Sequence, residues 1–456
     1  MQKKKIIFAA FIPLIIVALI LSFSFTGCKA TTTETTVAET TVAETAAAET
    51  TAAEPVELIF WMPVAQDDPH IPLFQEIDKH MKEKFNISVK FEGQSMDAWF
   101  ELLTTAGISQ AGPDLLFNWS GVAYGIDAGK NHLYEPLNDI LPDGMFDKIA
   151  GWGGITDSDG NIYGVPYDIA IAGLAYNKDM FTKAGIEFSD FPRLWYWDEF
   201  IEICQKLKDA GYTPLGFANK EGYYGEWWLG YPTASYFNSD EEISNYYQKE
   251  SVNSEPFLDA LAKYKYLYDQ GYFLKEGLTL DHTNNTQQQF IGEKVAMQFT
   301  EAMYTKTYVD SLGAEKVGAN FWVYLSNEGE NSKKVTGIYN HVIGITPWSE
   351  YKEESIKVLE ELCATDWGAN VIKQILGFTP SYKNWKPEAP DPNNPWSFVE
   401  GKAIEIIAQN GGSGDVASSY IQQFAQTIYQ FNNLFLTGDI TAEEFAKELD
   451  AARNIQ

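Results

Sequence analysis

The stretch VELIFWMPVAQDDPHIPLFQEIDKHMKEKFNISVKF, residues 56–91, predicts a strand, a helix and a second strand. Its two ends, 56–61 and 87–91, are short apolar runs typical of strands. Residues 72–85 predict a helix, because an apolar side chain recurs at every fourth position. The side chains that share this helix face are Leu73, Ile77, Met81 and Phe85. Strands separated by a helix of this length lie parallel and are joined by a crossover, so the fold class is α/β.

The same alternation continues along the chain. A second helix is expected over 97–106 and a third strand over 114–117, after the break at Gly112 and Pro113. Beyond residue 196 helices dominate, over 198–210, 254–270, 283–291, 353–364, 399–409 and 418–435. A last helix opens with a capping box at Thr441 and Glu444. Strand candidates return at 295–299, 317–323 and 335–345. This order indicates that the chain builds one lobe, then a second, and then revisits the first.

The N-terminus reads as an export signal. Three lysines, Lys3 to Lys5, precede an apolar run over 6–25 and then Gly27 and Cys28. The run is long enough to span a bilayer, so an uncleaved anchor is one interpretation. A signal peptide over 1–27, with Cys28 lipidated as the mature N-terminus, is the one we favour, because a small residue precedes the cysteine. We therefore expect an extracytoplasmic protein anchored to the cell membrane through Cys28.

Residues 28–55 predict a stalk rather than a domain. From residue 31 the chain repeats in fives, as TTTET, TVAET, TVAET, AAAET and TAAE. A glutamate every five residues matches neither the period of a helix nor that of a strand. The segment has no aromatic residue and too little apolar surface to form a core. We expect a flexible spacer between the membrane and the folded part.

Composition narrows the possible partners. The chain carries 63 acidic against 33 basic residues, a formal net charge of −30. Such a surface repels phosphate backbones and anionic lipids, which argues against nucleic-acid binding and polybasic membrane docking. Arg193 and Arg453 are the only arginines, so a bidentate site for phosphate or carboxylate is disfavoured. With Cys28 lipidated, Cys204 and Cys363 remain, either as buried hydrophobic residues or as a disulfide.

Five segments carry a resemblance to a known family. They read GPDLLF at 112–117, GNIYGVP at 160–166, YNKDMF at 176–181, WDEF at 197–200 and FIGEKVAM at 290–297. In this order they resemble the motifs of extracellular solute-binding proteins of ABC importers, in the sugar-binding branch that includes maltose- and multiple-sugar-binding lipoproteins. Together the motifs are specific, although each alone would be weak.

The resemblance implies a periplasmic-binding-protein-like fold with two α/β lobes and a hinge of three crossing strands. Ligand would bind between the lobes, which close around it. The implied lobes are 56–170 plus 301–340, and 171–300 plus 341–456. The implied crossings lie near 169–172, 299–301 and 340–342.

A site for a neutral sugar needs aromatic rings for the C–H faces and polar side chains for the hydroxyls. The segment YYGEWWLGY at 223–231 is the densest candidate, with Glu226, Trp227 and Trp228, although any one ring of a helix is more often part of a core. Loops and strand ends supply the other candidates. They are Gln66, Asp67, Asn118, Trp119, Asp168, Glu301, Tyr304, Asn340 and His341. Relatives often place a tryptophan shortly after the strand that contains Ala296 and Met297, where this chain offers Tyr304 instead.

Motifs for catalysis are absent from the sequence. The five histidines show no paired metal spacing, and the Asp157–Asn161 segment lacks the glycine of a calcium loop, so we expect neither metal nor cofactor. No G-x-S-x-G motif is present. We expect a monomeric binding protein, not an enzyme, that delivers a neutral mono- or oligosaccharide to ABC permease subunits. A secreted glycoside-acting enzyme, the same fold binding peptide or polyamine, and a receptor for a sensor kinase are the alternatives.

Overall fold

The strand Val56–Met62 begins the first of three sheets in a computed structural model of the chain. The structure describes residues 54–64, 68, 70–94, 98–387, 389–410, 412–414 and 419–453. Residues 54–456 form one unit. The predicted signal peptide, lipidated Cys28 and most of the stalk lie outside the described residues, as do Gln66 and Asp67. Within the described ranges, no helix is both long and apolar enough to cross a membrane.

The first lobe is built on a five-stranded sheet in the order β2-β1-β3-β11-β4. Its strands are β1 (Val56–Met62), β2 (Ile87–Gly93), β3 (Leu115–Trp119), β4 (Val165–Pro166) and β11 (His341–Ile345). Strand β1 pairs in parallel with β2 and β3, as the sequence predicts, whereas β11 runs antiparallel to β3. The helices of this lobe are α1 (Ile71–Phe85), α2 (Trp99–Ser109), α3 (Asp127–Lys130), α4 (Met145–Lys148), α12 (Lys352–Cys363) and α13 (Asp366–Leu376).

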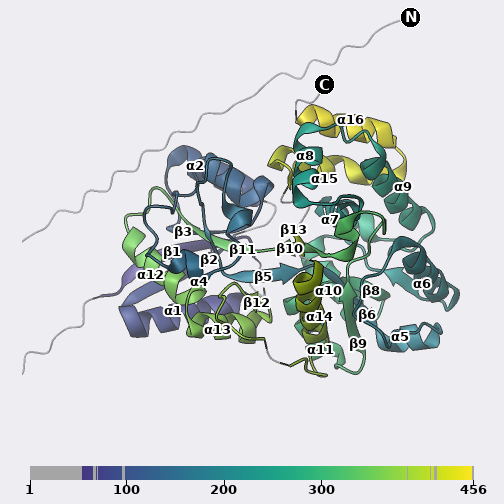
Figure 1. Cartoon of the computed structure of the whole chain (residues 1–456), viewed down its shortest axis with the longest axis horizontal. Helices are drawn as coiled ribbons and strands as arrows, with labels where there is room; N and C mark the ends of the chain where they lie inside the picture. Colours follow the sequence, from purple (N-terminus) through teal and green to yellow (C-terminus); the bar gives the residue numbers. More distant parts are fainter. Residues whose placement is uncertain are drawn as a thin grey trace, which may run out of the picture. The chain divides into compact units, whose positions relative to one another are not determined.

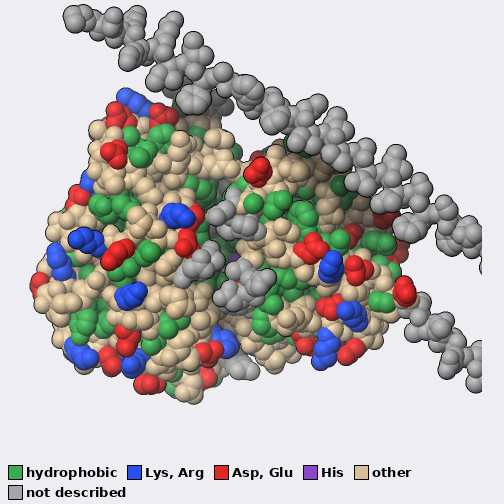
Figure 2. Space-filling view, turned by 180° about the vertical axis from the view of Figure 1, so that it is seen from behind, with side chains coloured by type: hydrophobic (Ala, Val, Ile, Leu, Met, Phe, Trp, Pro, Cys, Tyr) green, Lys and Arg blue, Asp and Glu red, His purple; other side chains and the backbone are tan. Residues whose placement is uncertain are grey.

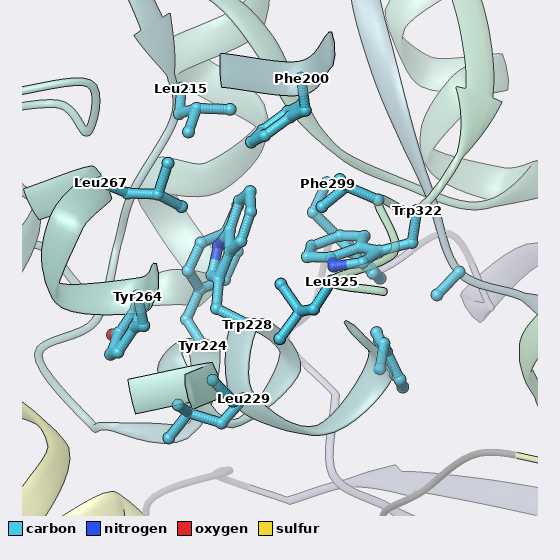
Figure 3. Packing of buried hydrophobic residues seen from close by; sticks show 14 of the residues in the cluster. Phe200, Leu215, Tyr224, Trp228, Leu229, Tyr264, Leu267, Phe299, Trp322 and Leu325 are labelled. Carbon is cyan, nitrogen blue, oxygen red and sulfur yellow. The ribbon is translucent and has the colours of Figure 1, made fainter. Parts of the chain in front are cut away.

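The second lobe is built on a four-stranded sheet in the order β7-β8-β6-β9. Its strands are β6 (Gly173–Asn177), β7 (Thr213–Leu215), β8 (Val295–Thr300) and β9 (Val317–Phe321). Its helices are α5 (Lys178–Lys183), α6 (Trp197–Asp209), α7 (Tyr223–Thr233), α8 (Asp240–Lys249), α9 (Glu255–Asp269), α10 (His282–Ile291), α15 (Gln422–Thr437) and α16 (Ala442–Ala452). Aromatic side chains fill much of the core between this sheet and its helices, as Figure 3 shows around Trp228 and Trp322.

A third sheet, in the order β12-β5-β10-β13, lies between the two lobes (Figure 1). Its strands are β5 (Asp168–Ile171), β10 (Val335–Tyr339), β12 (Thr379–Pro380) and β13 (Gly412–Gly414), with α11 (Ala302–Leu312) and α14 (Pro395–Asn410) nearby. Strand β5 carries the chain from β4 to β6, and β10 carries it back to β11, so these two strands link the lobes.

The sequence-based assignment of the lobes needs a correction at two strands. It placed 301–340 with the first lobe and 341–456 with the second. In the structure β9 pairs with β6 of the second sheet, and β11 pairs with β3 of the first. Two predicted crossings coincide with β5 and with the junction of β10 and β11. The third, at 299–301, is wrong as a change of sheet, because β8 and β9 on either side of α11 share one sheet.

Most predicted elements are confirmed within a few residues. Helix α1 buries Leu73, Ile77 and Met81 on the predicted face. The capping box of Thr441 and Glu444 is present at α16. The predicted single strand over 335–345 is two strands, β10 and β11, which separate at Asn340 because the chain changes sheet there. Cys204 and Cys363 are buried free thiols in different lobes, which settles that alternative.

Candidate functional site

An aspartate–histidine pair joins β5, one of the two strands that link the lobes, to β11 of the first-lobe sheet. Asp168 opens β5 and His341 opens β11. One Asp168 oxygen accepts the backbone N–H of His341 at 3.0 Å, and the other lies 2.8 Å from its Nδ1. Burial lowers the pKa of His341, but the charge and hydrogen bond of Asp168 outweigh it and leave that pKa above its usual value. The pair therefore fixes the geometry of the hinge, and both residues are almost wholly inaccessible.

A second pair of the same kind lies beside the first. His70, which precedes α1, places its Nδ1 2.9 Å from Asp68, and its ring centroid lies 5.4 Å from that of His341. Burial raises the pKa of Asp68, but the hydrogen bond and charge of His70 lower it by more, so the pKa lies below its usual value. The paired carboxylates hold both imidazole rings in fixed orientations. His70, and through it Asp68, is thereby packed against the hinge.

Glu301 is a buried acid at the start of α11. Tyr339, at the end of β10, donates its hydroxyl to the Glu301 carboxyl. Burial raises the pKa of Glu301 to about 7, although His341 and the Tyr339 hydrogen bond act in the opposite direction. At neutral pH this carboxyl is therefore protonated in a large fraction of molecules and can donate a hydrogen bond. Tyr304, one turn further along α11, is packed against core residues of both lobes.

Glu226 forms the corresponding acid in the second lobe. The hydroxyls of Tyr420 and Tyr429 both donate to it, the latter at 2.7 Å. Burial raises the pKa of Glu226 to about 7, against the lowering effect of these two hydrogen bonds. The Tyr429 oxygen also lies 3.1 Å from that of Tyr124, in the short π-helix η2 (Val122–Ile126) of the first lobe. The two lobes are hydrogen-bonded to each other through this tyrosine pair.

The aromatic segment of α7 divides into two faces. Tyr223 and Trp227 are partly exposed, and Trp227 stacks on Phe299 with ring centroids 4.0 Å apart. Trp228 is 3% exposed and packs against Phe200 and Trp322 in the second-lobe core (Figure 3). Trp227 therefore belongs to the candidate site. Trp228 does not, and the prediction that it contacts ligand is wrong because its helix position points toward the sheet.

The remaining predicted residues line the edge of the first lobe. Asn118 is buried in β3, and its side-chain oxygen accepts the N–H of Trp119. The rings of Trp119 and Tyr124 pack against each other with their centroids 5.6 Å apart. Asn340 donates its side-chain amide to the Asp168 carbonyl, so it stabilises the hinge from inside and does not face an open surface.

The chain matches known proteins over most of its folded part. A model of the bacterial extracellular solute-binding protein family matches residues 67–360. The chain belongs to this family. A binding protein of Brucella abortus (strain 2308) is 29% identical over 325 residues, which are 68% of this chain and 73% of that one. An sn-glycerol-3-phosphate-binding periplasmic protein of Agrobacterium fabrum (strain C58) is 27% identical over 163 residues, 34% of this chain and 37% of its own.

The fold of this solute-binding protein also matches solved structures. A chitin oligosaccharide binding protein superposes with a TM-score of 0.74 at 20% identity, covering 88% of this chain and 98% of that one. At this level of identity the likeness concerns the fold. It agrees with the two sheets and linking strands described above.

Sequence reasoning missed three tyrosines of the solute-binding protein's candidate site, Tyr124, Tyr420 and Tyr429. Tyr124 follows β3 by five residues, so the rule that places ligands beyond strand ends could have included it. Tyr420 and Tyr429 are separated from Glu226 by about two hundred residues of chain. No local pattern marks them.

The basic residues of highest affinity for anions lie outside this site. Arg193 pairs with Asp190 and Glu199, and Arg453 pairs with Asp450. Both arginines are therefore committed to structural ion pairs. Neither guanidinium is therefore placed to bind an anion at the candidate site.

Proposed function

We propose that this solute-binding protein captures a neutral saccharide between its lobes and presents it to the permease of an ABC importer. The observation that carries the proposal is the grouping of half-exposed aromatic rings with two buried acids whose pKa values lie near 7. Trp227 and Tyr223 offer flat apolar faces, and Glu226 and Glu301 offer hydroxyl-binding groups in the same region.

The chemistry of these groups suits uncharged polyols. An aromatic ring packs against the C–H face of a sugar ring, which stays largely dehydrated on binding. A carboxyl with a pKa near 7 exchanges between donor and acceptor roles at neutral pH, so it can pair with hydroxyls of either orientation. A buried polar group rewards only a ligand that satisfies it, which favours specificity.

Binding and closure would be linked. A ligand that contacts both lobes stabilises the closed arrangement by its difference in affinity for the two states. The Tyr124–Tyr429 hydrogen bond is a contact that closure forms and opening breaks, since the two residues belong to different lobes. The closed form would be the one that the permease recognises, and the chemistry requires no covalent step.

A phosphorylated ligand is the second candidate, because one relative is named for sn-glycerol 3-phosphate. The site described here argues against it. Its titratable groups are acids and histidines, and both arginines are paired elsewhere. A phosphate placed beside Glu226 or Glu301 would meet like charge whenever the carboxyl is ionised, and the site offers no arginine to offset it, so we favour the neutral ligand.

Location follows from the family and from the leader sequence. The family is extracellular, and we propose that cleavage before Cys28 and lipidation of its thiol tether the mature protein to the cell membrane. Metabolic labelling with a fatty acid tests this, with Cys28→Ser as the variant that should lose both label and membrane fraction.

Calorimetry and thermal-shift measurements test the proposed ligand class. The panel contains xylo-, malto- and chitooligosaccharides, sn-glycerol 3-phosphate, a polyamine and a peptide mixture. We expect binding by at least one glycan and no product formation on long incubation. Absence of binding by every glycan would overturn the saccharide assignment, and hydrolysis at enzyme-like rates would overturn the assignment as a binding protein.

A further inference from the structure

A cavity of about 350 Å³ lies beside the candidate site, over the first lobe. Its volume falls in the range of small-molecule sites, about 300–1,000 Å³. Helix α2 forms one wall, and η2 and α3 form another. Gln422, the first residue of α15, adds a side chain from the second lobe. Because both lobes contribute, the cavity has its full lining only when the lobes are close together.

The wall from α2 uses one helix face. Phe100, Thr104 and Gly107 recur at the spacing that aligns side chains along a helix. A Cβ at Gly107 would lie 3.1 Å from a methyl group of Leu133, which is tighter than most contacts. Glycine thus allows the helix to approach the segment after α3 closely and keeps the wall smooth.

The lining combines apolar surface with hydroxyl-binding groups. Ile108, at 82% exposure, and the half-buried Phe100 provide apolar contacts on α2. Asp127, Asn131 and Gln422 provide carboxyl and amide groups at the same cavity. A large exposed isoleucine beside amides and an acid is suited to a ligand with both C–H faces and hydroxyls.

The cavity shares lining residues with the candidate site. Asn118 and Tyr124 line it, and Tyr124 also reaches Tyr429 and through it Glu226. Trp119, in contact with the Tyr124 ring, lies at the same junction. Tyr124 thus lies between the cavity and the site, and a ligand longer than one unit would extend past it.

We infer that this cavity is a subsite for a further sugar unit, so that the protein's ligand is an oligosaccharide. The inference rests on the proposed saccharide function and adds to it the length of the ligand and the position of one end. One unit would bind between Trp227 and the two glutamates, and a following unit would bind between α2 and Gln422.

The test measures affinity against glycan length. Calorimetry is run with xylo-, malto- and chitooligosaccharides of one to five units on the wild type and on Thr104→Trp, which places a large ring in the cavity from an exposed position. Thr105→Trp is the matched control. Thr105 is also exposed on α2 and also donates its hydroxyl to the carbonyl four residues back, but it does not line the cavity.

We expect wild-type affinity to rise with length, and Thr104→Trp to lose at least ten-fold for the longer glycans while the shortest bound glycan is unaffected. Thr105→Trp should match the wild type at every length. An identical length dependence in Thr104→Trp and the wild type overturns the subsite and leaves the saccharide function intact. Absence of binding by every glycan to the wild type overturns the saccharide function and, with it, the subsite.

Discussion

At the scale of single residues, Trp227 and Trp228 show how adjacent side chains divide between site and core. Consecutive positions on a helix are rotated by about 100°, so the two rings cannot share one environment. Trp227 keeps an exposed face and stacks on Phe299, whereas Trp228 is enclosed by the second-lobe core. The pair therefore offers a matched comparison of binding and stability.

We predict that Trp227→Ala weakens glycan binding by about 1–2 kcal/mol, the loss of one stacking face, with a small effect on stability. Trp228→Ala should instead destabilise the protein by about 3–5 kcal/mol through the cavity it leaves. Calorimetry reports the first change and urea unfolding the second. Unchanged glycan affinity in Trp227→Ala would remove α7 from the site.

Glu226 permits a prediction about pH. Its folded pKa of about 7 exceeds its usual value near 4.5, so the folded state holds a proton that the unfolded state releases. The stability from this carboxyl is complete below pH 4.5 and is lost as pH rises toward 7. Glu226→Gln cannot ionise, so unfolding at pH 8 should require roughly 1–3 kcal/mol more than in the wild type, with little difference at pH 4.5. Urea unfolding at both pH values measures this, and equal differences at both would contradict it.

At the scale of elements, the contact between η2 and α15 couples the lobes. Tyr429 donates to Glu226, so in the Tyr124–Tyr429 pair the hydroxyl of Tyr124 is the donor. Tyr124 of the first lobe therefore donates to Tyr429, which donates to the buried Glu226 of the second lobe. The Tyr124–Tyr429 hydrogen bond stabilises only the arrangement in which the two lobes are in contact.

We predict that Tyr124→Phe and Tyr429→Phe each weaken glycan binding about two- to ten-fold, and that the double variant loses less than the sum, because both remove the same Tyr124–Tyr429 hydrogen bond. Tyr429→Phe also removes the hydrogen bond from Tyr429 to Glu226, so its loss should be the larger of the two. Tyr420→Phe is the control, since Tyr420 donates to the same acid from within the second lobe. It should change stability more than affinity. Additive losses in the double variant would show that the two hydroxyls act separately.

Helices and strands could be predicted from the sequence more reliably than the sheets and side chains that they contact. The face of α1 and the capping box of α16 depend on residues a few positions apart, and both are confirmed. The sequence predicts β9 and β11 as strands but assigns them to the wrong lobes, because an apolar run does not indicate which sheet the strand joins. The tyrosines around Glu226 lie about two hundred residues away in the chain, beyond any local pattern.

At the scale of the whole molecule, many acids of the described residues lie on exposed faces of helices. Figure 2 shows lysines interspersed among Asp and Glu on the face it presents. Several lysines pair with an acid four residues away on the same helix, such as Lys206 with Glu202 and Lys306 with Asp310. Exposed pairs of this kind contribute about 0.3–0.5 kcal/mol each. The net acidity is therefore a property of the surface, whereas Glu226 and Glu301 are buried.

The buried acids and histidines together predict how stability of the whole protein varies with pH. Glu226, Glu301 and His341 have raised pKa values, so the stability that they contribute is lost as pH rises through each folded-state pKa. That pKa is about 7 for the two acids and lies above the usual histidine value for His341. Asp68 has a lowered pKa, so its contribution is lost only as pH falls below its usual range.

We therefore predict that the melting temperature of the ligand-free protein is highest near pH 5 and falls between pH 5 and pH 8. Mutual repulsion within a net charge of −30 acts in the same direction, because it grows as carboxyls ionise. Differential scanning calorimetry at constant ionic strength measures the profile. Adding salt should screen the surface repulsion and leave the decrease in melting temperature that comes from the buried groups. The double variant Glu226→Gln with Glu301→Gln should reduce this remaining decrease. A melting temperature that rises steadily from pH 5 to pH 8 would show that these acids ionise freely in the folded protein.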